Sequence, residues 1–145
     1  VMVACTMPQV YCESSPNSVS GQGAGIGWIG TQSIWAAEFT LFAHSVPSGQ
    51  FGIFYYGPNQ IQAPFGDGFR CVGAGLLGTY RLPVQQADSF GDVYCVLDFN
   101  APPADAGAGM IVDGMEWNFQ FWYRDPPGVN ATFNLTDALT VEFCP

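Results

Sequence analysis

The feature that most constrains the fold of this chain is a strict alternation of side chains over residues 115–125. Every second residue is large and apolar: Met115, Trp117, Phe119, Phe121 and Tyr123. The intervening residues are mostly polar: Glu116, Asn118, Gln120, Trp122 and Arg124. A period of two residues is typical of a β-strand with one buried face. The segment therefore predicts a strand that crosses a core.

Shorter segments repeat this alternation, separated by Gly, Pro, Asn and Asp. Over residues 91–99 the apolar phase is Val93, Cys95, Leu97 and Phe99, and over 33–44 it is Trp35, Ala37, Phe39, Leu41 and Ala43. We expect a strand in each segment, and about nine strands in all, with no convincing helix between them. The pattern predicts an all-β fold, an antiparallel β-sandwich of immunoglobulin-like or jelly-roll-like type.

The 145 residues fit one domain. We expect an N-terminal apolar arm at 1–12 and a single β-sandwich domain at 13–145. No apolar run approaches the ~18 residues that would cross a bilayer, so membrane insertion is not expected. The start has no charged-then-apolar leader, and we expect the numbering to begin on a mature, processed chain.

The charge balance excludes two classes of partner. The chain has no lysine, three arginines (Arg70, Arg81 and Arg124) and twelve acidic residues, for a net charge of −9. Proteins bind nucleic acid mainly through Lys and Arg, so nucleic acid and anionic membranes are excluded. Charged residues are 10% of the chain, well below the ~25% of ordinary domains. A surface rich in Ser, Thr, Asn, Gln and Gly is typical of secreted proteins and of chains that pack against copies of themselves.

The chain has five cysteines, at positions 5, 12, 71, 95 and 144. There is no C-x-x-C pair and only one histidine, which excludes a zinc site of the usual spacing. Abundant Gly and Pro with short strands favour a disulfide framework, and hence an extracellular or cell-surface location. Because the count is odd, either one thiol is buried and inert or one cysteine links two chains.

The sequence offers little catalytic machinery. His44 is the only histidine available as a base, no G-x-S-x-G motif is present, and His44 precedes a Ser-Val-Pro turn. G-x-G-x-x-G at 25–30 lacks the strand–helix context of a nucleotide site. The acids available for glycoside hydrolysis are Glu38, Glu116, Asp125 and Glu142, a set that most proteins can match. We interpret the chain as a non-enzyme, with a secreted hydrolase as the second alternative.

Metal chemistry is limited to calcium. Aspartates lie at several turns: Asp67, Asp105, Asp113 and Asp125. Oxygen-rich loops can bind Ca²⁺, but no D-x-D-x-D-G spacing occurs and aspartate also forms turns by itself. We expect no cofactor, with Ca²⁺ left open.

The polar face of residues 115–125 is the candidate binding site. An exposed Trp122 beside Asn118, Gln120 and Arg124 would stack on a sugar ring and hydrogen-bond its hydroxyls. The alternative is structural: Trp122 packs under a loop while Arg124 holds the following Asp-Pro-Pro turn.

Several motifs together resemble an uncharacterised domain of secreted and surface proteins from planctomycete- and myxobacteria-like bacteria. They are YC-x-x-x-x-NS, QFGIFYYG, PFGDGFRCVG, WNFQFWYRDP and NLTDALTVEFC. The resemblance covers roughly residues 11–145 and implies an extracellular β-fold without an assigned activity.

The resemblance also implies a disulfide between Cys12 and Cys71. A second pair, Cys5 with Cys144, requires the arm to lie beside the last strand. Cys95 shares a phase with buried positions, so we expect it to be the free thiol.

The leading functional hypothesis is a structural or adhesive extracellular domain that assembles with copies of itself. The arm, with Val1, Val3 and Val10, would add a strand to a neighbour's sheet edge and build a filament or surface layer. The first alternative is a carbohydrate-binding module. N-glycosylation patterns occur at Asn130 and Asn134, which in a bacterial chain would be coincidence.

Overall fold

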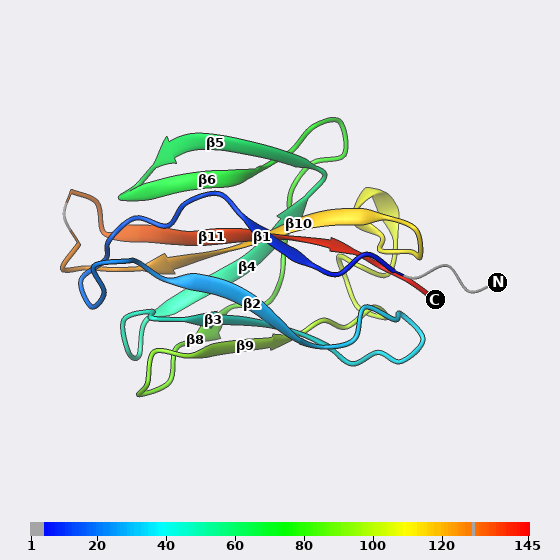
Figure 1. The fold of residues 1–145 in the computed structure, drawn as a ribbon, viewed down its shortest axis with the longest axis horizontal. Helices are drawn as coiled ribbons and strands as arrows, with labels where there is room; N and C mark the ends of the chain where they lie inside the picture. Colours follow the sequence, from blue (N-terminus) through cyan, green and yellow to red (C-terminus); the bar gives the residue numbers. More distant parts are fainter. Residues whose placement is uncertain (1–4, 129) are drawn as a thin grey trace.

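The chain folds into β-strands arranged in layers, as the alternation predicts (Figure 1). The structure is a computed structural model that describes residues 5–128 and 130–145. These residues form eleven strands and one short 3₁₀ helix, η1 (Gly107–Gly109). Every strand ladder is antiparallel. The expected count was about nine strands; two of the eleven observed, at residues 80–81 and 85–86, are too short to show any alternation.

The largest sheet has six strands. In spatial order they are β1 (Gln9–Tyr11), β11 (Phe133–Glu142), β10 (Glu116–Arg124), β4 (Phe51–Gly57) and β7 (Tyr80–Arg81), with β8 (Gln85–Gln86) also paired to β4. The second sheet is β2 (Gly25–Gly30), β3 (Phe39–His44) and β9 (Val93–Val96). A separate hairpin is formed by β5 (Asn59–Phe65) and β6 (Gly68–Gly73).

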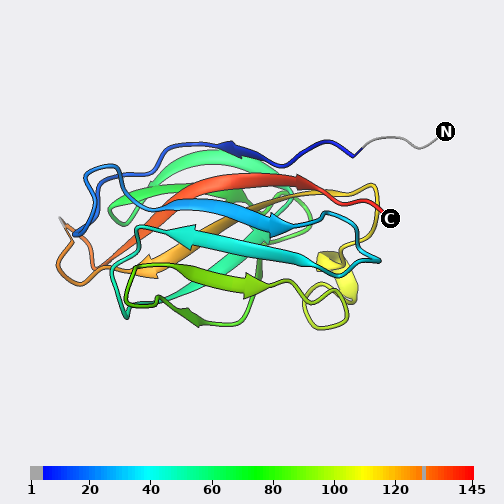
Figure 2. The same ribbon diagram turned by 60° about the horizontal axis from the view of Figure 1, so that its bottom comes forward.

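The main core lies between the six-stranded and three-stranded sheets (Figure 2). Trp117, Phe119, Phe121 and Tyr123 on β10 are fully buried, so the predicted apolar phase is confirmed there. The apolar phase of residues 93–99 is also buried. Phe39 on β3 lies 6.4 Å from Phe119, measured between ring centroids, and joins the two sheets. The architecture is a β-sandwich.

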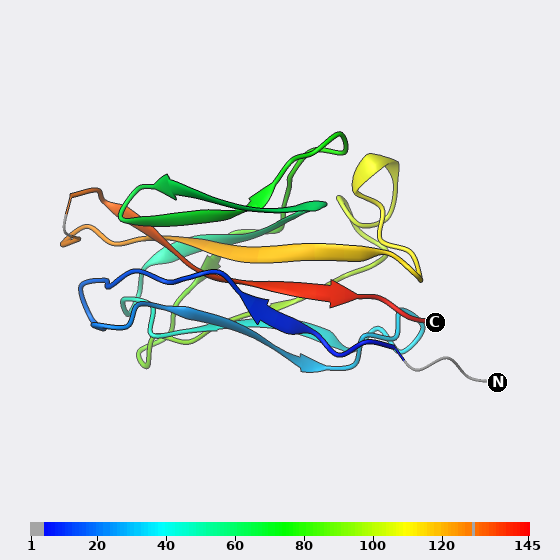
Figure 3. The ribbon, with the colours of Figure 1, turned by 45° about the horizontal axis from the view of Figure 1, so that its top comes forward.

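The β5–β6 hairpin adds a third layer over the outer face of the six-stranded sheet (Figure 3). A small buried cluster of Cys71, Val72 and Ala138 fills the space between hairpin and sheet. The Tyr11 hydroxyl donates a hydrogen bond to the Cys71 carbonyl at 2.8 Å. This layer decides which parts of the outer face stay open to solvent.

The strand expected over residues 33–44 is wrong in its first half. β3 begins at Phe39, and Trp35 is 87% exposed. Residues 33–37 form a turn in which the Ala37 amide donates to the Ser33 and Ile34 carbonyls and Ala37 has a positive φ of 53°. Ile34 is in turn tied to the Cys144 carbonyl. These local hydrogen bonds override the apolar alternation.

The N-terminal arm lies against its own domain. β1 pairs with β11 of the same chain, in the register Val10 opposite Leu139. The Val10 side chain faces outward and is 54% exposed. Residues 9–11 therefore pair within their own chain. β1 is the edge strand of the six-stranded sheet, and strand addition to a neighbour stays a prediction. Val1 and Val3 lie outside the described residues.

Two disulfides fix the arm at both ends. Cys5 is bonded to Cys144 and Cys12 to Cys71, as predicted. The second bond connects the end of the arm to strand β6 of the hairpin. Cys95 is buried and free, and burial raises the pKa of its thiol. No helix among the described residues has the length and apolar character needed to cross a membrane.

We predict that replacing Cys12 and Cys71 together by Ala lowers the free energy of unfolding by about 4 kcal/mol, since the bond closes a long loop in the unfolded chain. Urea denaturation without reductant measures the change. Cys95→Ala, which removes a buried sulfur but no cross-link, is the control and should cost about 1 kcal/mol. Equal losses in the two variants would contradict the role of the bond.

Candidate functional site

The polar face of β10 is divided into covered and open parts. Asn118 and Gln120 are 2% and 0% exposed, so the prediction that they contact a ligand is wrong. The hairpin lies over the middle of the strand and converts both amides into internal hydrogen-bonding groups. Trp122 is half-buried and Arg124 is exposed. Of the predicted face, only the end with Trp122 and Arg124 is therefore open to a ligand.

Gln120 joins the hairpin to the sheet. Its Nε2 donates to the carbonyls of Phe69 at 2.9 Å and Thr136 at 2.6 Å. Its Oε1 accepts from the Cys71 amide at 2.9 Å and from the Tyr55 hydroxyl. Both donors and both acceptor positions of this carboxamide are used. The residue is a structural link between three strands and the hairpin.

The Asn118 carboxamide is likewise engaged in hydrogen bonds within the protein. Its Nδ2 donates to the Gly57 carbonyl at 3.3 Å, and its Oδ1 accepts from Thr140 Oγ1 at 2.7 Å and from Gln60 Nε2 at 3.3 Å. No donor of this amide faces the solvent.

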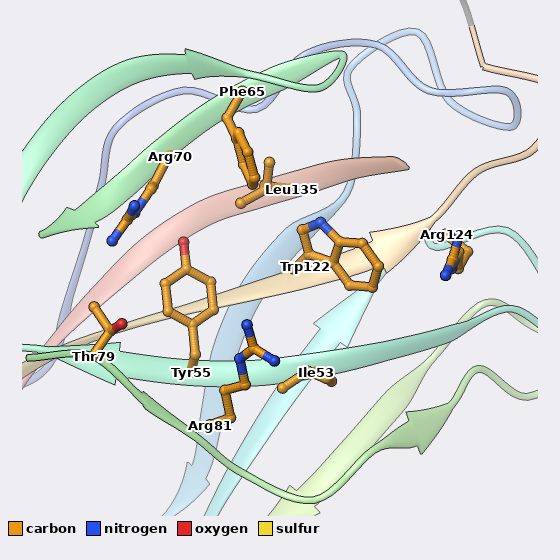
Figure 4. Close-up of a pocket in the computed structure, with 9 residues that line it drawn as sticks. All are labelled: Ile53, Tyr55, Phe65, Arg70, Thr79, Arg81, Trp122, Arg124 and Leu135. Atoms are coloured by element: carbon orange, nitrogen blue, oxygen red, sulfur yellow. The ribbon is translucent and has the colours of Figure 1, made fainter. Parts of the chain in front are cut away.

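Beyond the hairpin's cover lies a pocket of about 500 Å³ (Figure 4). Its floor follows from strand register: Trp122 on β10 stands opposite Ile53 on β4 and opposite Leu135 on β11. Tyr55 and Thr79 line one part of the pocket and Phe65, on the hairpin, another. The volume lies within the 300–1,000 Å³ typical of small-molecule sites.

All three cationic side chains of the protein line this pocket. Arg70 comes from β6, Arg81 from β7 and Arg124 from the last residue of β10. Arg70 donates from Nε to the Val72 carbonyl at 3.1 Å, and the Arg124 guanidinium lies 5.5 Å from the Trp122 ring centroid. Within residues 5–128 and 130–145, none of the three guanidinium groups pairs with a carboxylate.

The lining contains no acidic residue at all, although the chain carries twelve. Positive charge is therefore concentrated at one place on a molecule whose net charge is −9. Arginine presents a planar fork of donors that matches carboxylate and sulfate groups, and an unpaired guanidinium keeps those donors free. The pocket has the electrostatics of an anion site.

The side chains that line the pocket are cationic, aromatic, aliphatic and hydroxyl groups. No histidine, cysteine or carboxylate is among the lining residues. Burial raises the pKa of the Tyr55 phenol well above its ordinary value, and the Arg70 charge offsets only part of this. Tyr55 therefore stays a neutral hydroxyl, already engaged with Gln120. The lining offers cations and aromatic surface without a general base for neutral pH.

The sequence pattern identified Trp122 and Arg124 but missed Arg70 and Arg81. Arg70 lies in a strand 54 residues before Arg124, and Arg81 in a two-residue strand without alternation. The one sequence signal that could have pointed to them is the small number of cationic residues. When a chain has only three cations, each stands within a few residues of an aromatic side chain, and no lysine is present, their convergence is worth testing.

His44 lies elsewhere, exposed at the end of β3. Its Nδ1 is 3.1 Å from Ser45 Oγ, and the Asp137 carboxylate, which accepts the Ile26 amide at 2.8 Å, is near enough for the two charges to interact. None of these residues lines the pocket of the arginines. The predicted position of His44 at the exposed end of a strand is confirmed.

Two of the other acids face each other, and the rest are dispersed. Glu116 and Glu142 are directly opposite each other on β10 and β11, at the end of the outer face away from the arginines, and Glu142 accepts the Thr6 amide at 3.0 Å. Glu38 is exposed in a different loop. Asp125 is fully buried and accepts hydrogen bonds from the Ser18 amide and hydroxyl.

One of the turn aspartates, Asp67, is used by the backbone. Asp67 Oδ1 accepts from the amides of Asn130 and Ala131, which ties the hairpin turn to the β10–β11 loop. Asp105 and Asp113 are exposed at other turns. Among the described residues no three His, Cys, Asp or Glu side chains are grouped as metal ligands. Of the two glycosylation patterns, Asn130 is exposed, whereas Asn134 is buried and donates to the Pro16 carbonyl at 3.1 Å.

Comparison with known proteins gave no match to a family model, to a curated protein or to a solved structure.

We predict that Gln120→Leu lowers the free energy of unfolding by about 3–5 kcal/mol, because it strands two buried donors and two buried carbonyls. Gln60→Leu is the matched control: its exposed amide makes two hydrogen bonds, and its loss should cost about 1 kcal/mol or less. Chemical denaturation distinguishes the variants. If the Gln120→Leu protein is as stable as the control, the structural role of Gln120 is wrong and the residue is again a candidate for ligand contact.

A second prediction concerns Asp137. Burial raises its pKa above the ordinary value, while the Ile26 amide and the His44 charge lower it by less. A raised pKa in the folded state favours the protonated acid, so this contribution to stability is present below the unfolded pKa and is lost as pH rises through the folded pKa.

Asp137→Asn, which keeps an acceptor for the Ile26 amide, should therefore be more stable than the parent at pH 7. The difference should shrink as pH falls toward the ordinary value of 3.8. Denaturation at pH 7 and pH 4 measures it, with the exposed Asp113→Asn as control. A variant less stable at pH 7 would show that the interactions of the charged Asp137 carboxylate outweigh the cost of its burial.

Proposed function

We propose that this chain is a non-catalytic extracellular binding domain whose ligand is an anion held in the pocket of Arg70, Arg81 and Arg124. The observation that carries the proposal is the convergence of every cationic side chain, each without a carboxylate partner, on one aromatic-lined cavity. Arg70 is half-buried and Arg81 and Arg124 are exposed, so their donors are open to a ligand that supplies the anion. The two disulfides support an oxidising setting.

Self-assembly through the arm has less support than ligand binding. Exchange of the arm between copies would require β1 to leave β11. The bonds at Cys5 and Cys12 hold the segment on both sides of β1. A hydrolase is supported less again, because the pocket lining has no group that transfers protons at neutral pH.

The test is thermal unfolding in the presence of small anions. Galacturonate, sulfate and citrate are added separately in excess, with sodium chloride at equal ionic strength as reference. Because a ligand that binds only the folded state raises the melting temperature, we expect a rise with at least one of the three anions. Replacing the three arginines together by Gln should abolish it.

The triple variant changes the net charge from −9 to −12, and a matched control separates charge from position. Gln22→Glu, Ser48→Asp and Ala108→Asp add three negative charges at exposed residues outside the pocket lining. This control should keep the anion-dependent rise. A rise that survives in the arginine variant, or no rise with any of the three anions, would overturn the proposal.

A further inference from the structure

The three arginines are placed to meet a ligand with several separated negative groups. They come from three different elements, β6, β7 and the end of β10. Figure 4 shows Arg70 and Arg124 toward opposite sides of the pocket, with Tyr55, Arg81 and Trp122 between them. A small anion such as sulfate can accept from several guanidinium groups only where they converge on one point. A ligand that carries charges along its length engages all three.

The floor between the charges is apolar. Ile53, Trp122 and Leu135 form one row across three strands, and Tyr55 and Phe65 extend it. An inorganic anion would leave this surface in water. Sugar rings present C–H faces that pack on aromatic side chains, together with hydroxyls for partners such as the Thr79 hydroxyl.

The charge of the rest of the molecule limits the size of the ligand. Outside the pocket the surface carries most of the twelve acids and no Lys or Arg side chain. At physiological ionic strength charges interact over about 8 Å. A ligand whose charges stay within the pocket meets only the arginines, whereas a long, densely charged chain also meets the acidic surface around them.

An acidic peptide has suitable charges but fits the floor less well. Its backbone is flexible, so ordering it in the pocket costs conformational entropy, and its carboxylates stand on short side chains without rigid ring faces between them. A saccharide ring is rigid and brings its apolar face and its charge as one unit. The apolar row between the arginines therefore favours rings.

From the charge spacing, the apolar floor and the acidic surroundings we infer that the ligand is a short acidic oligosaccharide, whose rings carry carboxylate or sulfate groups. This inference rests on the anion-binding function proposed above. It assigns Arg70, Arg81 and Arg124 to the anionic groups and Trp122 to a ring.

Isothermal titration with matched ligands tests it. The central probe is tri-galacturonate, compared with its methyl triester, which keeps the rings but has no charge, and with N-acetylated, C-amidated tri-glutamate, which keeps three carboxylates but has no rings. A sulfated trisaccharide distinguishes sulfate from carboxylate as the preferred group. Galacturonate monomer and long polygalacturonate test how the affinity depends on the length of the ligand.

We expect tri-galacturonate or the sulfated trisaccharide to bind at least about tenfold more tightly than the triester, tri-glutamate and the monomer, since each charged hydrogen bond is worth about that factor. The long polymer should bind no more tightly per trisaccharide than the trimer. Trp122→Leu, which keeps an apolar side chain, should weaken the trisaccharide by a similar factor and leave tri-glutamate unchanged.

Two results would overturn the inference and leave the proposed anion site standing: tri-glutamate binding as tightly as the trisaccharides, or only the small anions of the melting experiment binding. Equal binding of the triester would also overturn it, because charge would then not be used. Unchanged tri-galacturonate binding in the triple arginine-to-Gln variant would remove both the inference and the proposed function.

Discussion

The pocket exists because the β5–β6 hairpin is fixed above the outer face of the six-stranded sheet, and the contact that fixes it is the carboxamide of Gln120. This one side chain bonds to two backbone groups of β6, to β11 and to Tyr55 on β4. The Gln120 side chain is 0% exposed, and its bonds to the Cys71 amide and the Thr136 carbonyl are fully buried. The Cys12–Cys71 disulfide adds a covalent tie between β6 and the end of the arm. Together they hold Arg70 and Phe65 opposite Trp122.

The distribution of charge indicates what this pocket binds. A chain with twelve acids and three cations would lower its energy most simply by pairing each arginine with a carboxylate on the surface. Here the arginines instead share one cavity with aromatic side chains and no acid. Placing three like charges in one cavity costs free energy through repulsion. A bound anion removes that cost, which is why the arrangement points to a ligand rather than to stability.

Much of the fold follows from local pattern, and the site follows from it only in part. The alternation on β10 placed Trp117, Phe119 and Phe121 in the core, because a strand with one buried face has no other way to satisfy a period of two. The same pattern cannot reveal what covers the opposite face. Asn118 and Gln120 look like surface residues in sequence and are buried, because a hairpin about 50 residues earlier in the chain folds over them.

The failures share one physical cause, which is that tertiary and local hydrogen bonds outweigh periodicity. In the segment before β3, the tie from Ile34 to the last residues of the chain and the turn at Ala37 interrupt the predicted strand. In the arm, the pairing of β1 with β11 adds an edge strand that the apolar pattern did not predict. Arg81 joined the pocket through a two-residue strand that no pattern marks.

The scarcity of arginine makes the central claim directly measurable. Because the chain has three arginines, the side-chain Nε–Hε region of a ¹⁵N–¹H spectrum should contain three signals. Each signal belongs to one of the arginines that line the pocket. Titration with tri-galacturonate or a sulfated trisaccharide should shift all three along a single saturating curve. Signals that stay in place, or that move independently with unrelated midpoints, would contradict a shared site.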